Sequence, residues 1–248
     1  MPPLPRESGS ALRPSRRERY QSLLKPLFIV FVAALLALVF AHLGSEVVEG
    51  DTRFFDMQLL RGAQSLRAAH PWLAEVMRDL SGLGSTTVLA LFTVATTGYL
   101  ALISARTSAF LVATSVISGS ILVSVFKAAF GRLRPDAAYA ELSVAGLSFP
   151  SGHASMSAIV FLTLGSLLAS THNRRAERIY ILATAVLMTL LVGLSRVALG
   201  VHWATDVLGG WAFGAAWAIL WLLVARHISR RAEHNANSRA DGSERANR

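Results

Sequence analysis

Ser195–Asp206 has the sequence SRVALGVHWATD and joins two long apolar segments of the chain. His202 and Asp206 are four residues apart, so their side chains share one face if the second segment begins there as a helix. A carboxylate bonded to one imidazole nitrogen fixes the tautomer and leaves the other nitrogen free to act as a base or nucleophile. Arg196 adds a planar cation that suits phosphate oxygens. The alternative interpretation is a plain helix start, capped by a histidine and an aspartate.

The composition indicates a polytopic membrane protein. Of the 248 residues, 53% are hydrophobic and 16% are charged, and the mean hydropathy is +0.47, which is too apolar for an ordinary soluble domain. The formal net charge is +9. Because the basic residues cluster in the tails and in short loops beside apolar segments, anionic headgroups explain them better than nucleic acid does. The sequence has no cysteine, which excludes disulfides and thiol catalysis.

Six apolar segments have the length that membrane-spanning helices need, and they predict an all-α fold. These segments are residues 26–43, 81–105, 107–126, 151–170, 179–194 and 203–224. They divide the chain into a basic tail over 1–25, a six-helix membrane domain over 26–225, and a polar tail over 226–248. We expect the first tail to be disordered or bound to the membrane surface.

Residues 44–80 interrupt this pattern between the first and second spans. Six acidic residues and four arginines alternate there with apolar residues at roughly helical spacing. This spacing predicts one or two amphipathic helices that either lie on the membrane surface or cover the protein. The region could shape an entrance for a lipid, or it could be a cover without selectivity.

Lysine and arginine asymmetry predicts the orientation. The two tails, Arg106 and the connection 174–178 together carry 16 of the 24 Lys and Arg residues. The positive-inside rule therefore places both tails in the cytoplasm. Residues 44–80, the loop 128–150 and the turn at Gly200 fall on the opposite side. We accordingly expect a multi-pass protein of the cytoplasmic (inner) membrane whose active site faces the periplasm or the cell exterior.

Three polar clusters share that opposite face. Their residues are Lys127, Arg134 and Pro135 (Lys-x6-Arg-Pro); Pro150, Ser151, Gly152 and His153; and Ser195, Arg196, His202 and Asp206 (Ser-Arg-x5-His-x3-Asp). Taken singly, the cations could be anchors at span ends, and the serine could be a helix N-cap. Taken together, three cations, two histidines and an aspartate at one membrane face indicate a site for an anion with several oxygens.

These clusters resemble the three-part signature of the type 2 phosphatidic acid phosphatase superfamily, which also contains vanadium haloperoxidases and bacterial acid phosphatases. Every signature position is matched between residues 127 and 206, and the six spans resemble the family's membrane branch of bacterial lipid phosphate and diphosphate phosphatases. The resemblance implies that His202 is the nucleophile, that Asp206 orients it, and that His153 is the general acid. The phosphate-binding residues that it implies are Lys127, Arg134, Ser151, Gly152 and Arg196.

The predicted function is hydrolysis of a membrane lipid phosphate or diphosphate through a phosphohistidine. The resemblance suggests undecaprenyl diphosphate, phosphatidylglycerol phosphate or phosphatidic acid, in that order. No metal or other cofactor is expected, because the cations already neutralise the phosphate and no carboxylate cluster accompanies them. The partners are the lipid substrate and the bilayer, with no nucleic acid, and the sequence does not predict the oligomeric state.

Three other functions stay open. A lipid phosphotransferase would use the same phosphohistidine and would depend on an acceptor. A haloperoxidase would hold vanadate in the same pocket, although the short chain and the six spans disfavour it. A lipid-binding membrane protein with an inactive site would need no intact catalytic set, so the presence of His202, Asp206 and His153 disfavours it.

Overall fold

The computed structural model of the chain describes residues 16–142 and 144–246, and these form helices and connecting turns. The helices are α1 (Arg16–Glu49), α2 (Arg53–Ala69), α3 (Trp72–Gly82), α4 (Thr86–Leu102), α5 (Arg106–Phe130), the 3-10 turn η1 (Ala137–Tyr139), α6 (Gly152–Ser170), α7 (Arg175–Ala198) and α8 (Ala204–Ala246). Six segments are long and apolar enough to cross a membrane. The prediction of an all-α, six-span membrane protein is confirmed.

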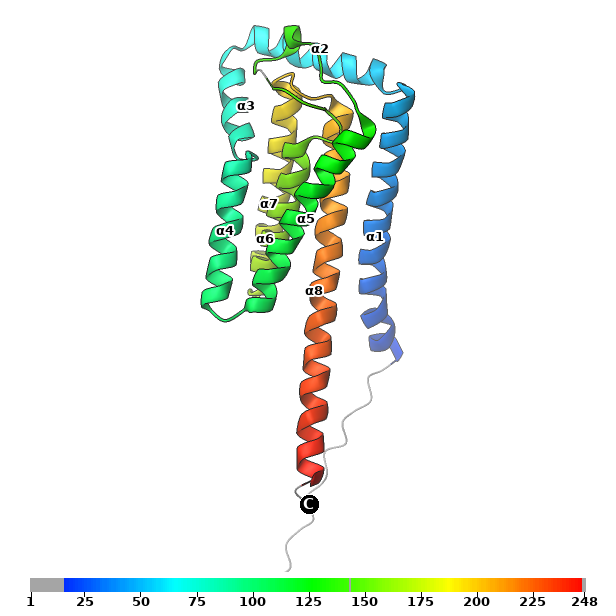
Figure 1. Cartoon of the computed structure of the whole chain (residues 1–248), viewed down its shortest axis with the longest axis vertical. Helices are drawn as coiled ribbons and strands as arrows, with labels where there is room; N and C mark the ends of the chain where they lie inside the picture. Colours follow the sequence, from blue (N-terminus) through cyan, green and yellow to red (C-terminus); the bar gives the residue numbers. More distant parts are fainter. Residues whose placement is uncertain (1–15, 143, 247–248) are drawn as a thin grey trace, which may run out of the picture.

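The spanning helices run side by side, and α2 lies across one end of the bundle (Figure 1). The loop between α5 and α6, which contains η1, lies at that same end, whereas the turn between α4 and α5 lies at the opposite end. The helices α5 and α7 therefore finish, and α6 and α8 begin, at the end that α2 covers. This end is called the α2 end below.

Helix boundaries extend past those that the sequence predicted. The helix α1 continues to Glu49, and the second candidate span runs from Trp72 to Leu102, so that it includes α3 as well as α4. The predicted span boundaries followed the ends of the apolar runs, such as Leu43 for the first span. A charge marks where the chain leaves the hydrocarbon, but backbone hydrogen bonds carry the helix further. A new N-cap at Ser85, whose hydroxyl accepts from the Val88 amide at 3.3 Å, separates α3 from α4.

Both polar tails are helical over most of their described residues. Arg16–Lys25 belongs to α1 rather than to a disordered segment, and the polar residues from Arg226 to Ala246 continue α8. Extending an existing helix avoids the cost of nucleation, and alanine, arginine and glutamate are good helix formers. Residues 1–15 of the predicted N-terminal tail lie outside the described residues.

Small residues bring α6 and α8 into close contact. A Cβ atom at Gly210 would lie 3.0 Å from the Ser151 carbonyl oxygen, and one at Gly214 would lie 2.5 Å from that of Ser155. Close packing through small residues is a common way for membrane helices to associate without large apolar side chains. This packing holds the first turn of α6 against the first three turns of α8, next to the predicted site.

An aromatic cluster fixes the turn that leads into α6. The fully buried ring of Phe149 stacks on Phe40 of α1 at a centroid distance of 5.7 Å. Phe130 of α5 meets the same ring edge to face at 4.9 Å. Aromatic pairs of this kind stabilise by about 0.5–1.5 kcal/mol beyond their buried area. The residues just before α6 are thereby held to both α1 and α5.

Helix α2 packs on the protein through polar groups. Its buried residues are Asp56, Leu60 and Arg67, whereas Phe54, Phe55, Leu59 and Leu66 are exposed. The Arg67 guanidinium donates to the carbonyl oxygens of Ala198, at the end of α7, and of Tyr139, in η1. This helix therefore covers the protein, as one of the two sequence-based interpretations proposed, and presents apolar side chains outward.

Candidate active site

Four helix ends at the α2 end of the bundle, together with the α5–α6 and α7–α8 connections that hold Arg134 and His202, carry the predicted site residues (Figure 1). Lys127 lies in the last turn of α5, and His153 lies in the first turn of α6. Arg196 lies in the last turn of α7, and Asp206 lies in the first turn of α8. Because neighbouring helices run in opposite directions, residues up to 79 positions apart in the sequence meet in one place.

The pair His202 and Asp206 is fully buried. The imidazole Nδ1 of His202 lies 3.2 Å from Asp206 Oδ2, the contact that the four-residue spacing predicted. The same carboxylate oxygen accepts the Trp203 backbone amide at 2.9 Å, and Arg132 Nη1 donates to the other oxygen at 2.7 Å. Since Asp206 accepts hydrogen bonds, it holds His202 in the tautomer with its proton on Nδ1.

The opposite nitrogen of His202 faces the predicted phosphate site. Arg134 Nη1 lies 2.9 Å from Nε2, so this nitrogen offers its lone pair. Burial lowers the pKa of His202 to about 4, and this effect outweighs the raising effect of Asp206. Burial also lowers the pKa of Arg134 from its ordinary value. At neutral pH, His202 is therefore an uncharged imidazole whose Nε2 can act as a nucleophile.

The other two predicted cations have partners that a phosphate could replace or add to. Lys127 Nζ donates to the carbonyl oxygen of Leu147 at 2.6 Å. Arg196 is buried and donates through Nη1 to Ser81 Oγ at 2.5 Å. Its Nε has no hydrogen-bond partner among the described residues. A buried guanidinium N–H without an acceptor is costly, so an incoming phosphate oxygen would stabilise it.

Helix α6 directs its N-terminus toward this cluster. Ser151 is its N-cap, with Oγ 3.5 Å from the Ala154 amide, and the Ser151 amide donates to the Asp206 carbonyl oxygen at 2.9 Å. The first amides of a helix have no partner within the helix and suit an anion. A Cβ atom at Gly152 would lie 3.9 Å from Lys127 Cε, which places this backbone beside a cation.

Two residues in the site were missed by the sequence analysis. Ser148 Oγ donates to Asp206 Oδ2 and lies 3.3 Å from His202 Nδ1. Arg132 bridges Asp206 to Asp56 of α2. Neither Ser148 nor Arg132 lies at a sequence spacing from the predicted site residues that would have identified it. The one available hint was a carboxylate, Asp56, placed among the apolar residues of the amphipathic region.

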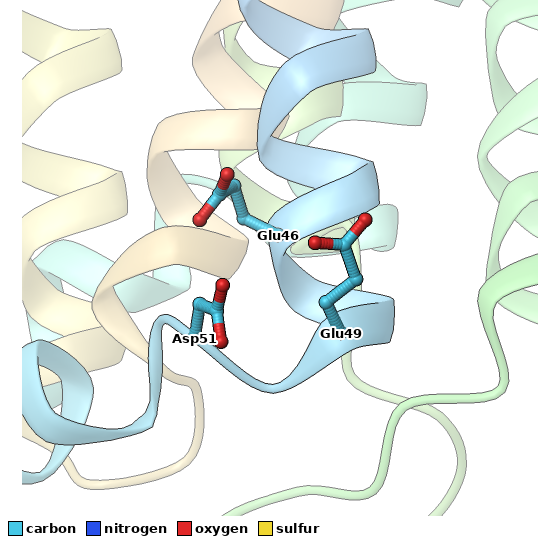
Figure 2. A group of neighbouring side chains, drawn as sticks. All are labelled: Glu46, Glu49 and Asp51. Atoms are coloured by element: carbon cyan, nitrogen blue, oxygen red, sulfur yellow. The ribbon is translucent and has the colours of Figure 1, made fainter.

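A separate group of carboxylates lies at the end of α1. Figure 2 shows Glu46, Glu49 and Asp51, whose oxygens lie within 4.8 Å of one another. In the part of the chain that the structure describes, they form the one group of three such side chains close enough to share a metal ion. Glu49 and Asp51 are exposed, and the group includes none of the predicted site residues.

An apolar cavity of about 460 Å³ opens from the site between α4, α5 and α6. Lys127, Gly152 and His153 line its polar end. Its remaining walls are mostly small or aliphatic, from Gly84, Thr86, Leu89, Ala90, Val116, Ile117, Ser120, Ile121, Val123, Ser124 and Met156. The cavity therefore joins a cationic end to a space lined by membrane-spanning helices.

These features define a polytopic membrane phosphatase. A family model described as the PAP2 superfamily matches residues 108–230. The chain is 30% identical over 183 residues to phosphatidylglycerophosphatase B of Bacillus subtilis, covering 72% of this chain and 87% of that protein. The chain belongs to the PAP2 superfamily, as the signature residues predicted.

Two further comparisons agree with this assignment. A lipid A 1-phosphatase of Rhizobium johnstonii is 31% identical over 118 residues, or 44% of each chain. The crystal structure of a transmembrane PAP2 type phosphatidylglycerolphosphate phosphatase from Bacillus subtilis aligns with a TM-score of 0.74 at 28% identity. That alignment covers 80% of this chain and 98% of the other.

Proposed function

We propose that this phosphatase hydrolyses a lipid phosphate without a metal ion, through a phosphohistidine on His202. The observation that carries the proposal is the cavity, which has Lys127 and His153 at one end and aliphatic walls along the rest. Such a shape suits a ligand whose phosphate stays at the headgroup level while its chains remain among membrane helices.

The residues support a two-step reaction. His202 Nε2 attacks phosphorus, the bond to the leaving oxygen breaks, and His153 gives that oxygen a proton. Water then attacks the phosphohistidine and passes its proton to His153, and inorganic phosphate leaves. Lys127, Arg134 and Arg196, with the first amides of α6, would bind the nonbridging oxygens.

The relatives favour phosphatidylglycerophosphate as the substrate. The Bacillus subtilis protein that the chain matches over most of its length is named phosphatidylglycerophosphatase B. This comparison moves phosphatidylglycerophosphate ahead of undecaprenyl diphosphate, which headed the sequence-based order. Undecaprenyl diphosphate and phosphatidic acid remain the substrates to compare with it.

Phosphate release by the purified full-length protein in detergent tests this proposal. We expect release from phosphatidylglycerophosphate in the presence of EDTA, and none from the His202→Ala variant. Vanadate, a phosphate mimic, should inhibit phosphate release by the wild-type protein. No release from any of the three lipids, or activity that EDTA removes and magnesium restores, would contradict the proposal.

We also infer that the site faces the periplasm or the cell exterior. The basic helix starts at Arg106 and Arg175 lie at the end of the bundle opposite the site. The positive-inside rule places that basic end in the cytoplasm. Because the chain has no cysteine, Ser65→Cys on α2 and Asn173→Cys before α7 provide single labelling positions. A membrane-impermeant maleimide added to intact cells should label Ser65→Cys alone, and the reverse pattern would overturn the orientation.

A further inference from the structure

A buried carboxylate outside the family signature is connected to the nucleophile. Asp56 of α2 is 1% exposed. Its Oδ1 accepts the Thr205 backbone amide at 2.9 Å, and its Oδ2 accepts the Thr205 hydroxyl at 2.7 Å. Asp56 is thus an anion at the N-terminus of α8, where the helix dipole stabilises it. It also holds the residue next to Asp206.

Arg132 joins this carboxylate to Asp206. Its Nη2 donates to Asp56 Oδ2 at 2.6 Å, and its Nη1 donates to Asp206 Oδ1 at 2.7 Å. Both carboxylates are fully buried, and the arginine side chain is 14% exposed. A planar guanidinium can bridge two carboxylates in this way, whereas the single ammonium of a lysine cannot reproduce the fork.

The bridge completes the set of hydrogen bonds around Asp206. His202, Ser148 and the Trp203 amide all contact Oδ2, which leaves Oδ1 to Arg132. With both oxygens bonded, the carboxylate cannot rotate away from His202. The positive charge of Arg132 also offsets the negative charge of Asp206, and the negative charge of Asp56 partly offsets that of Arg132. The charge that His202 experiences therefore depends on a residue of α2.

We propose that Asp56, acting through Arg132, positions Asp206 and sets how strongly Asp206 holds the Nδ1 proton of His202. This inference rests on the proposed role of His202 as the nucleophile. Asp56 and Arg132 are positioning residues, since neither lies at the phosphate site. Helix α2 therefore contributes a residue that influences the position of Asp206 and the proton affinity of His202.

The electrostatic prediction has a definite sign. The other charged or titratable groups that influence His202 are Asp206, Arg134, Lys127 and His153, and all of them remain in the variants proposed below. Removing the positive charge of Arg132 lets Asp206 stabilise the imidazolium more, so His202 should take up a proton at higher pH. Removing the negative charge of Asp56 leaves Arg132 uncompensated, so the shift should run toward lower pH.

The test compares Arg132→Met with Asp56→Asn in the full-length protein. The measurement is kcat, KM and the pH dependence of kcat/KM on a short-chain lipid phosphate. Loss of a residue that orients a functional group typically costs about 10- to 100-fold, and we expect this loss in kcat with little change in KM. The acidic limb of the pH profile should move to higher pH in Arg132→Met and to lower pH in Asp56→Asn.

Arg67→Gln is the matched control, because Arg67 is also a buried polar residue of α2. It binds the carbonyl oxygens of Ala198 and Tyr139 and does not contact Asp206. We expect this variant to lower the melting temperature and to leave the acidic limb in place. If Arg67→Gln moves the limb as Arg132→Met does, the effect comes from the docking of α2 and the proposal is wrong.

Two milder variants keep the proposal testable if Arg132→Met does not fold. Asp56→Asn preserves shape, and Arg132→Lys preserves charge. The double variant that combines Asp56→Asn with Arg132→Lys should lose less activity than the product of the two single losses, because both substitutions break the same Asp56–Arg132–Asp206 bridge. A fully multiplicative loss would overturn the proposal. An inactive wild-type protein would instead indicate that the proposed function fails, and Asp56→Asn with unchanged kcat and pH profile would refute only this inference.

Discussion

The two parts of the chain before and after Arg106 contribute differently to the site. All eight predicted catalytic and phosphate-binding residues follow Arg106, in α5–α8 and their connections. The preceding part contributes Ser81, which binds Arg196, and the Gly84–Ala90 wall of the cavity. We therefore propose that the chemistry resides at four helix ends and in their connections, whereas access and support depend on helices that lack the signature.

This comparison predicts that two kinds of variant will respond to different properties of the substrate. The effects of changes in the later part should depend on the leaving group, because its residues are proposed to act at the phosphorus. Changes in the α4 wall should depend on the length of the lipid chain, because that wall lines the cavity. A substrate panel that varies both properties separates the two contributions.

The largest of these effects is expected for His153→Ala. General acid catalysis is typically worth about 100- to 10,000-fold, and a lipid alkoxide needs the proton that His153 would supply. A nitrophenolate leaves without that help, so the same variant should lose far less rate on nitrophenyl phosphate. Steady-state rates on the two substrates measure the ratio. Equal losses on both would remove the general-acid role.

A smaller effect is expected for Ala90→Trp, which places a large side chain in the cavity wall. A misfit of about one methylene in an apolar pocket typically costs about 1–3 kcal/mol, so we expect a loss of roughly 10- to 200-fold in kcat/KM for a long-chain lipid phosphate. Nitrophenyl phosphate, which has no lipid chain, should be hydrolysed as before. The control is Val94→Trp, at a position of α4 that is 70% exposed and does not line the cavity. Equal effects of the two tryptophans on the lipid would mean that the cavity does not hold the chains.

The smallest effect concerns pH. Because the pKa of His202 is about 4, well below the ordinary value of 6.5, roughly nine-tenths of the free enzyme has a neutral His202 at pH 5. The acidic side of the kcat/KM profile should therefore show no loss of activity near pH 6.5, and the acidic limb that reports protonation of His202 should appear only toward pH 4. Two substrates whose phosphates have different pKa values distinguish the enzyme limb from the substrate limb. An acidic limb near pH 6.5 common to both substrates would contradict a neutral His202.

The sequence predicted much of the fold because charge-free apolar runs are visible without tertiary information. The six spans and their order followed from such runs, but the helix ends did not, since charged residues such as Glu46 and Glu49 continue α1 beyond the apolar part. The amphipathic spacing of residues 44–80 predicted helices. It could not predict that α2 would turn Asp56 and Arg67 inward, because that choice depends on partners such as Arg132 and Ala198.

The predicted site residues were recognisable as a set because their three clusters resemble a family signature, and one pair among them also follows from helix geometry. The four-residue separation of His202 and Asp206 is a helical spacing, and the structure places the two side chains in contact. Ser148 and Arg132 follow no such rule. Arg132 lies two residues before Arg134, and from the sequence alone it is one more cation near a span end. Its role depends on a carboxylate 76 positions away in the chain, which only the folded structure brings near.

Trapping of the phosphoenzyme tests the central claim most directly. Rapid alkaline quench of the wild-type protein with radiolabelled substrate preserves phosphohistidine, which is identified by its stability in base and its hydrolysis in acid. We predict that the wild type forms it, that His202→Ala forms none on either the lipid or nitrophenyl phosphate, and that His153→Ala still forms it from nitrophenyl phosphate. Phosphohistidine that persists in His202→Ala and disappears in His153→Ala would reverse the assigned roles and contradict the account.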